Sequence, residues 1–331
     1  MNLVNTNTMS VQDTNALKGL ALILMLIHHL FYKQNGLFDD IHIWGDHYLF
    51  NEFGIFAKIC VSIFVFLSGY GLMVQTDQKD SIGSLTVFYF HRFKKLFMNY
   101  WFIWIIFVPI SYLCFGLTFQ NAYQSDVCWH LITDVLGVHS LIFNDVYCYN
   151  PTWWFYSCII VLYLLFPIMY KSIKNDPLPI ILLTLIVSFL PIPFIDVIRF
   201  YIVAFALGMW LATQKSLQMK SKWIFLILAL LYAVGRNTNS YPIMIDCLLT
   251  LIVVQLYRSI KWPDLLIRVM AFIGRHSMNI FLFHTFIFHF WYKDFIYISR
   301  IPIIILFTLL SICLIISILL EWLKKYTIYR I

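Results

Sequence analysis

The chain has 331 residues, of which 61% are hydrophobic, 19% aromatic and only 12% charged, and its mean hydropathy is +0.81. These values exclude a soluble globular domain and indicate a membrane protein. The net charge of +7 would suit a nucleic acid, but the basic residues are placed as membrane topology predicts, so no nucleic-acid partner is expected.

Apolar runs predict an all-α bundle of about ten transmembrane helices, embedded in the lipid of the cell membrane as one domain spanning residues 1–331. The first run lacks a small-residue cleavage site and carries Lys and His, so it is expected to remain as the first helix and not to be removed as a signal peptide. In chain order, the predicted spans lie near 16–32, 55–75, 96–117, 153–170, 178–194, 197–213, 223–236, 241–257, 277–292 and 302–322.

Basic residues concentrate in alternate connections between these spans, and this asymmetry predicts the orientation. With the N-terminus inside, the outer connections hold only Lys33, Lys58, Arg199, Arg236, Lys293 and Arg300. The inner side holds Lys79, Arg92, Lys94, Lys95, Lys171, Lys174, Lys215, Lys220, Lys222, Arg258, Lys261, Arg268, Arg275, Lys324, Lys325 and Arg330. Both termini are therefore expected to face the cytoplasm.

The first span contains two adjacent histidines, His28 and His29, in the run KGLALILMLIHHLFYK that begins at Lys18. An ionisable side chain inside a membrane span is costly and is by default a candidate for function. The 11 steps from Lys18 to His29 return to within about 20° on one helix face, roughly 16 Å apart along the axis, whereas His28 lies about 80° off that face. A histidine pair that only bonds neighbouring helices is the structural alternative.

The longest outer connection, 118–150, spaces the apolar residues of CWHLITDVLGVHSLIF as a surface helix does, which predicts a lid on the bundle or a helix on the membrane face. Cys128 and Cys148 share this segment, and the sequence leaves open whether they pair. No CxxC or His/Cys ligand cluster accompanies them, so no metal site is indicated. Aromatic residues at span ends, Trp154 among them, are typical first of interfacial anchors and second of substrate stacking.

The spacing from Lys18 to His29 is followed, in order, by CVSIFVFLSGYGL at 60–72, HRFKKLFMNYW at 91–101, NPTWWFYSCIIVLYLLFPI at 150–168 and FIGRHSMNIFLFHTFI at 272–287. Together these stretches resemble the acyltransferase-3 family of membrane O-acyltransferases, over nearly the whole chain. The first helix of that family carries a basic residue, ten others and a histidine. The later stretches resemble its Ser-Gly-aromatic helix end, its Arg-x-x-Arg helix start, its Trp-led span and its closing Leu-x-His.

The chain departs from the family pattern at three points. Lys18 stands where arginine is commoner, the second basic pair reads Arg92 and Lys95, and Ser62 stands where many members carry an acid. Lysine keeps the positive charge but loses the planar fork that grips a phosphate with two hydrogen bonds.

The resemblance implies transfer of an acyl group, usually acetyl, from cytoplasmic acyl-CoA to a hydroxyl of an envelope polysaccharide or lipid-linked sugar. The donor is a substrate, so no permanently bound cofactor is implied. A neutral imidazole within reach of the hydroxyl can take its proton during attack on the thioester, and burial disfavours the charged imidazole. His29 is the expected base, with Lys18 on the same face.

The expected acyl-CoA-binding residues are Arg92, Lys94 and Lys95 at the cytoplasmic start of the third span, although the positive-inside bias explains the three equally well. His284, His28 and Trp154 are expected to support the site. A transporter of a glycan or its precursor is the alternative function, but matched broken helices and internal repeats, which are typical of transporters, are not evident.

Overall fold

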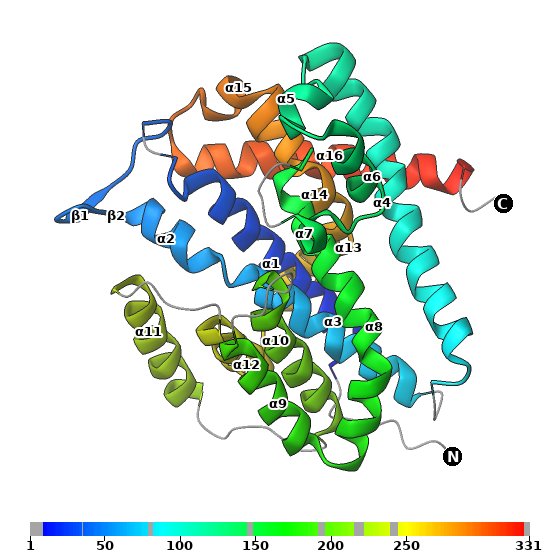
Figure 1. Cartoon of the computed structure of the whole chain (residues 1–331). Helices are drawn as coiled ribbons and strands as arrows, with labels where there is room; N and C mark the ends of the chain where they lie inside the picture. The colour runs from blue at the N-terminus through cyan, green and yellow to red at the C-terminus, as the bar shows by residue number, and fades with distance from the viewer. Residues whose placement is uncertain are drawn as a thin grey trace.

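The computed structural model describes residues 9–34, 36–78, 82–143, 148–190, 196–214, 222–238 and 244–327, most of which lie in helices (Figure 1). The hairpin of β1 (His42–Trp44) and β2 (His47–Tyr48) projects from one side of the bundle. The helical elements are α1 (Val11–Phe31), α2 (Leu49–Ala57), α3 (Cys60–Asp77), α4 (Leu85–Phe115), α5 (Phe119–Tyr123), α6 (Val127–Val135), α7 (His139–Ile142), η1 (Pro151–Trp153), α8 (Trp154–Asn175), α9 (Pro177–Phe189), α10 (Asp196–Thr213), α11 (Lys222–Thr238), α12 (Met244–Ser259), α13 (Asp264–Arg275), α14 (Ser277–Thr285), the π-helix η2 (Phe286–Trp291), α15 (Lys293–Tyr297) and α16 (Pro302–Thr327).

The all-helical prediction is confirmed, and each of the ten predicted spans overlaps helical structure. The bounds differ, since the span 55–75 is divided between α2 and α3, and α4 begins at Leu85 and not near residue 96. In the described part of the chain, five helical segments are long and apolar enough to cross a membrane: Val11–Phe31, Leu49–Asp77, Leu85–Phe115, Pro151–Asn175 and Pro302–Thr327. A sixth arises if α13 and the helix that follows it, which are bent by 56°, count as one span. The remaining apolar helices are shorter, so a total of ten spans stays a prediction.

The first helix begins at Val11, earlier than the predicted residue 16, because Ser10 and Asp13 cap it reciprocally. The Ser10 hydroxyl accepts a hydrogen bond from the Asp13 amide at 3.0 Å, and the Asp13 carboxylate accepts one from the Ser10 amide at 3.1 Å. This capping box satisfies amides that the first turn leaves without helical partners. Lys18 consequently lies about two turns inside α1.

Glycines let two pairs of helices cross at very short range. Where α3 and α10 cross, a Cβ atom at Gly69 would lie 2.3 Å from the carbonyl oxygen of Phe205, and one at Gly208 would meet the α3 backbone at 2.1 Å. Gly19 and Gly274 play the same part between α1 and α13. Close backbone approach through small residues is the usual basis of helix packing in membranes.

We expect Gly69→Ala to destabilise the protein by about 1–3 kcal/mol, since the added methyl group must push α3 away from α10. Gly71→Ala is the matched control, because it lies on the same helix and its Cβ would meet no atom within 4 Å. Thermal unfolding of both variants in one detergent measures the difference. Equal unfolding temperatures would show that the crossing tolerates a methyl group.

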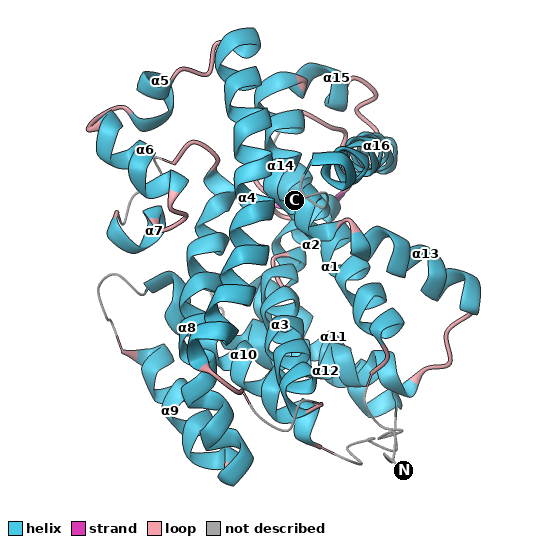
Figure 2. Cartoon of the chain, turned by 90° about the vertical axis from the view of Figure 1, so that its right-hand side faces the viewer, coloured by secondary structure: helices cyan, strands magenta, loops and turns pink. Residues whose placement is uncertain are grey.

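The outer segment 118–150 folds into three short helices, α5, α6 and α7, which gather on one side of α4 (Figure 2). The single surface helix predicted over its middle is divided at Gly137, whose φ of 67° is left-handed and whose missing Cβ leaves room for the Tyr156 ring. The segment buries the polar side chains of His130, Asp134 and His139. It is therefore packed around a polar interior of its own, while residues 144–147 lie outside the described ones.

Candidate functional site

The end of α1 brings His29 against the helix that carries His284. The two imidazole centroids lie 5.0 Å apart, and His28 and Phe288 flank the His29 ring at 5.1 and 6.2 Å. The His29 side chain is half-buried, and its ring makes no hydrogen bond to any residue that the structure describes. Its two nitrogens are thus available to a substrate.

His28 is engaged differently, although it is adjacent in sequence. Its Nδ1 lies 2.7 Å from the carbonyl oxygen of Gly54 in α2, and a carbonyl only accepts, so Nδ1 donates. Its ring stacks on Tyr32 with centroids 5.1 Å apart and planes 17° from parallel. His28 therefore holds α1 against α2. This is the role that the structural alternative, a histidine that bonds a neighbouring helix, gives to this residue.

His284 is fully buried in α14, and its tautomer follows from its partners. Nδ1 lies 3.0 Å from each of the carbonyl oxygens of Ile280 and Phe281, so it carries the proton and donates to both. Nε2 then keeps its lone pair. The Thr285 hydroxyl faces this nitrogen at 3.5 Å, and the fixed His284 ring packs against that of His29.

The basic residues predicted to bind the donor separate into three environments. The charge of Lys95 acts on the half-buried Lys18, so α4 and α1 bring these two cations together. Arg92 turns toward α3, where its Nη2 donates to Gln75 at 2.9 Å, and Lys94 lies exposed above the Phe90 ring. Of the three, Lys95 is therefore the residue whose charge reaches Lys18.

Trp154 packs on Tyr201 of α10, with ring centroids 5.7 Å apart, and no contact in the described part of the chain links it to His29. Its neighbour Trp153 is buried and donates from Nε1 to the carbonyl oxygen of Leu282 at 2.9 Å. Trp153, and not Trp154, thus reaches the helix that carries His284. Adjacent tryptophans at a span end give no sequence signal that distinguishes them.

A second polar cluster, which the sequence did not predict, surrounds Lys324 of α16. The Lys324 ammonium donates to Asn99, to Asn279 at 2.7 Å and to Glu321 at 2.9 Å, which uses all three of its N–H groups. Asn279 also donates to Glu321 at 2.7 Å. This Lys324 cluster joins α4, α14 and α16, and Asn99 lies one turn beyond Lys95 on α4.

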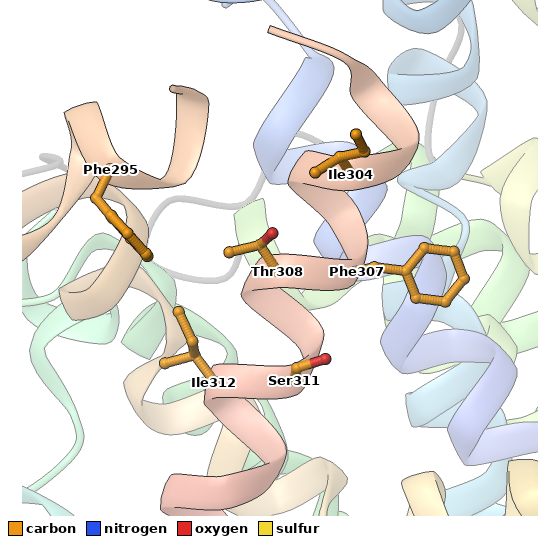
Figure 3. Close-up of a pocket in the computed structure, with 6 residues that line it drawn as sticks. All are labelled: Phe295, Ile304, Phe307, Thr308, Ser311 and Ile312. Atoms are coloured by element: carbon orange, nitrogen blue, oxygen red, sulfur yellow. The ribbon is translucent and has the colours of Figure 1, made fainter. Parts of the chain in front are cut away.

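The outer faces of α15 and α16 carry an open depression of about 440 Å³ (Figure 3). Phe295 and Ile312 lie on one side of it with Thr308 between them, while Phe307 points away. The other lining residues are Ile304 and Ser311, so no ionisable group lines it and its chemistry suits lipid contact.

No disulfide joins Cys128 to Cys148, and the Cys148 thiol donates to the carbonyl oxygen of Asn150 at 3.1 Å. Across the described ranges, no group of three or more His, Cys, Asp or Glu side chains is arranged to hold a metal ion. The chemistry that the chain can offer at His29 is accordingly that of imidazoles and cations.

The fold and the site define a helical membrane protein with an imidazole cluster at one end of its first apolar helix and a pair of cations toward the other. The family model described as an acyltransferase domain matches residues 11–322, and the chain therefore belongs to the acyltransferase-3 family. That membership supports acyl transfer as its activity.

Acyltransferase MdmB of Streptomyces mycarofaciens is 29% identical over 123 residues. This similarity covers 37% of the present chain and 30% of MdmB, so it spans only about a third of either protein. No solved structure matches the chain.

Proposed function

We propose that this protein transfers an acyl group, of which acetyl is the simplest, from cytoplasmic acyl-CoA to a hydroxyl of an envelope polysaccharide or a lipid-linked sugar. The observation that supports the proposal most strongly is the environment of the His29 ring. This ring is half-buried among His28, His284 and Phe288, has no hydrogen bond to the described residues, and lies on the same helix as Lys18. A base with uncommitted nitrogens is what activation of a hydroxyl requires.

In the proposed reaction the acceptor hydroxyl attacks the carbonyl carbon of the thioester while His29 takes its proton. Collapse of the tetrahedral intermediate breaks the C–S bond, and the proton on His29 passes to the departing sulfur, so that the products are an ester and free CoA. His284 orients His29 by packing beside it, with the ring centroids 5.0 Å apart. The reaction consumes acyl-CoA as a substrate and needs no permanently bound cofactor.

The donor enters from the side of Lys18 in this proposal. Lys18 and Lys95 provide positive charge for the CoA phosphates, with Arg92 and Lys94 near the same end of α4. The arm of the donor between its phosphates and its thioester then extends roughly 16 Å along α1, so that the thioester reaches His29. This route places the Lys18 end of α1 on the cytoplasmic side of the cell membrane, in agreement with the ten spans and cytoplasmic termini that the distribution of basic residues predicts.

Reversing the charges of Arg92 and Lys95 together to glutamate should raise the KM for acyl-CoA by about tenfold or more and leave the protein folded, because two cations at the start of α4, one of which acts on Lys18, become anions. Lys171→Glu with Lys174→Glu is the matched control, since it reverses two inner charges at the same spacing on α8. Steady-state kinetics of the purified protein measure the effect. An unchanged KM for acyl-CoA would assign Arg92 and Lys95 to topology alone.

The proposed function is tested by incubating the purified protein in lipid nanodiscs with radiolabelled acetyl-CoA and an envelope glycan extract. We expect label in alkali-labile ester linkage on the glycan fraction, together with release of free CoA. Transport of the glycan across the bilayer without ester formation would instead favour the transporter alternative.

A further inference from the structure

Buried hydrogen bonds join the outer segment 118–150 to α14 beside His284, and the reaction proposed above uses none of the residues that make them. Asp134 of α6 lies at the centre of the segment and is 1% exposed. Its Oδ2 accepts from the Tyr123 hydroxyl and from the backbone amide of Tyr149, each at 2.8 Å. The carboxyl group thus ties α5, α6 and the segment 148–150 before η1 together.

The backbone of Asp134 adds a bond to α4. Its carbonyl oxygen accepts from the buried hydroxyl of Tyr100 at 2.6 Å. Burial raises the pKa of the Asp134 carboxyl to about 7, and the bonds from Tyr149 and Tyr123 act in the opposite direction. A carboxyl group held away from water in this way is costly unless its hydrogen bonds are kept.

The segment 148–150 that Asp134 anchors continues directly into residues that bind α14. Asn150 Nδ2 and Trp153 Nε1 donate to the carbonyl oxygen of Leu282 at 3.3 and 2.9 Å, and we call this pair of bonds the Leu282 clamp. Thr152 adds a hydroxyl contact to Thr285 at 3.4 Å. Leu282 lies two residues before His284, so the clamp acts within one turn of the imidazole.

The clamp coincides with a change in helix type. In a continuous α-helix the carbonyl of Leu282 would bond the amide of Phe286, but the π-helix η2 begins at Phe286. Side chains that insert into the backbone ladder alter the course of a helix, and π-helical segments are frequent at functional sites. The groups that hold Leu282 therefore act on the helix at the point where its hydrogen-bonding pattern changes, one turn or less from His284.

We propose that Asp134 is a positioning residue for the acyl transfer, because its carboxyl group anchors the segment that carries the Leu282 clamp and thereby fixes His284 against His29. The inference rests on the function proposed above. It assigns the outer segment a part in catalysis, in addition to any part as a lid.

Transfer kinetics of the full chain in nanodiscs test the positioning. Asp134→Ala should lower kcat about tenfold or more, because even a small displacement of a catalytic group slows the chemical step strongly. The KM for acyl-CoA should stay within about twofold. Asp134→Asn should retain most of the activity, since its side-chain oxygen can still accept from Tyr123 and Tyr149. Tyr123→Phe removes one hydrogen-bond donor to Asp134 and should give a kcat between those of the wild type and Asp134→Ala. This variant tests the positioning if Asp134→Ala does not fold.

A second measurement is independent of activity. Cys148 is adjacent to Tyr149, and its labelling by a thiol reagent, quantified by peptide mass spectrometry, should become about tenfold faster in Asp134→Ala and not in Asp134→Asn. Cys128, which is exposed in the same segment, is the internal control and should label equally in all variants.

The outcomes separate the two proposals. A wild-type protein that transfers no acyl group would overturn the proposed function, and the positioning inference with it. An active wild type whose Asp134→Ala and Tyr123→Phe variants keep their kcat, or whose kcat and KM change in equal proportion, would overturn the inference alone.

Discussion

His29→Ala should lower acyl transfer by about 10²–10⁴-fold while the protein still inserts into the membrane, because that is the usual contribution of a general base. Its ring has no hydrogen bond to the described residues, so its removal breaks no bond that holds the fold. Transfer rates of the purified protein, normalised to the amount of folded protein, measure the effect. Full activity in His29→Ala would contradict the assignment of the base.

His28→Ala is the matched control on the adjacent residue. It removes the 2.7 Å bond to the Gly54 carbonyl and the stacking on Tyr32, so we expect a loss of stability of about 1–2 kcal/mol and a measurable residual activity. Equal loss of transfer in the two histidine variants would mean that the pair acts as one structural unit. Lys18→Arg should also be tolerated better than Lys18→Ala, since arginine keeps the charge.

Lys324→Ala should lower the free energy of unfolding by about 2–3 kcal/mol, because Asn99, Asn279 and Glu321 lose the ammonium that joins them. The value lies below that for breaking a fully buried ion pair, since the Glu321 side chain is 45% exposed and water can hydrate its charge. Thermal unfolding in detergent measures the change.

Lys325→Ala is the control for Lys324, because the two lysines are adjacent and Lys325 is exposed. We expect its effect to stay within about 0.5 kcal/mol, which is usual for a surface substitution. Equal effects of the two substitutions would show that the buried cluster contributes no stability beyond that of a surface charge.

Hydropathy and periodicity predicted the apolar centres of the long helices, because a backbone in lipid must satisfy its hydrogen bonds within a helix or a closed barrel. They did not predict α13 or the polar first turns of α4, which lie outside the apolar runs. The family, too, could be identified from five ordered stretches of sequence. The spacing from Lys18 to His29 holds in an unbroken α1, but its catalytic meaning stays a prediction.

Contacts between distant segments could not be predicted from the sequence, because they depend on how the helices pack. Lys324 and Lys325 are the same residue type in the same helix turn, and only the approach of Asn99 and Asn279 buries one of them. The same holds for Trp153 and Trp154, of which only the first meets α14. One residue of helical rotation, about 100°, separates each pair.

The central claim, that His29 catalyses O-acylation of an envelope glycan, is tested most directly in cells. Mass spectrometry can compare the O-acyl content of envelope glycans from cells that carry the wild-type protein, the His29→Ala variant or neither, with protein levels matched by immunoblot. We predict O-acyl groups in the wild-type cells alone. O-acyl content in the His29→Ala cells equal to that of the wild type would contradict the claim.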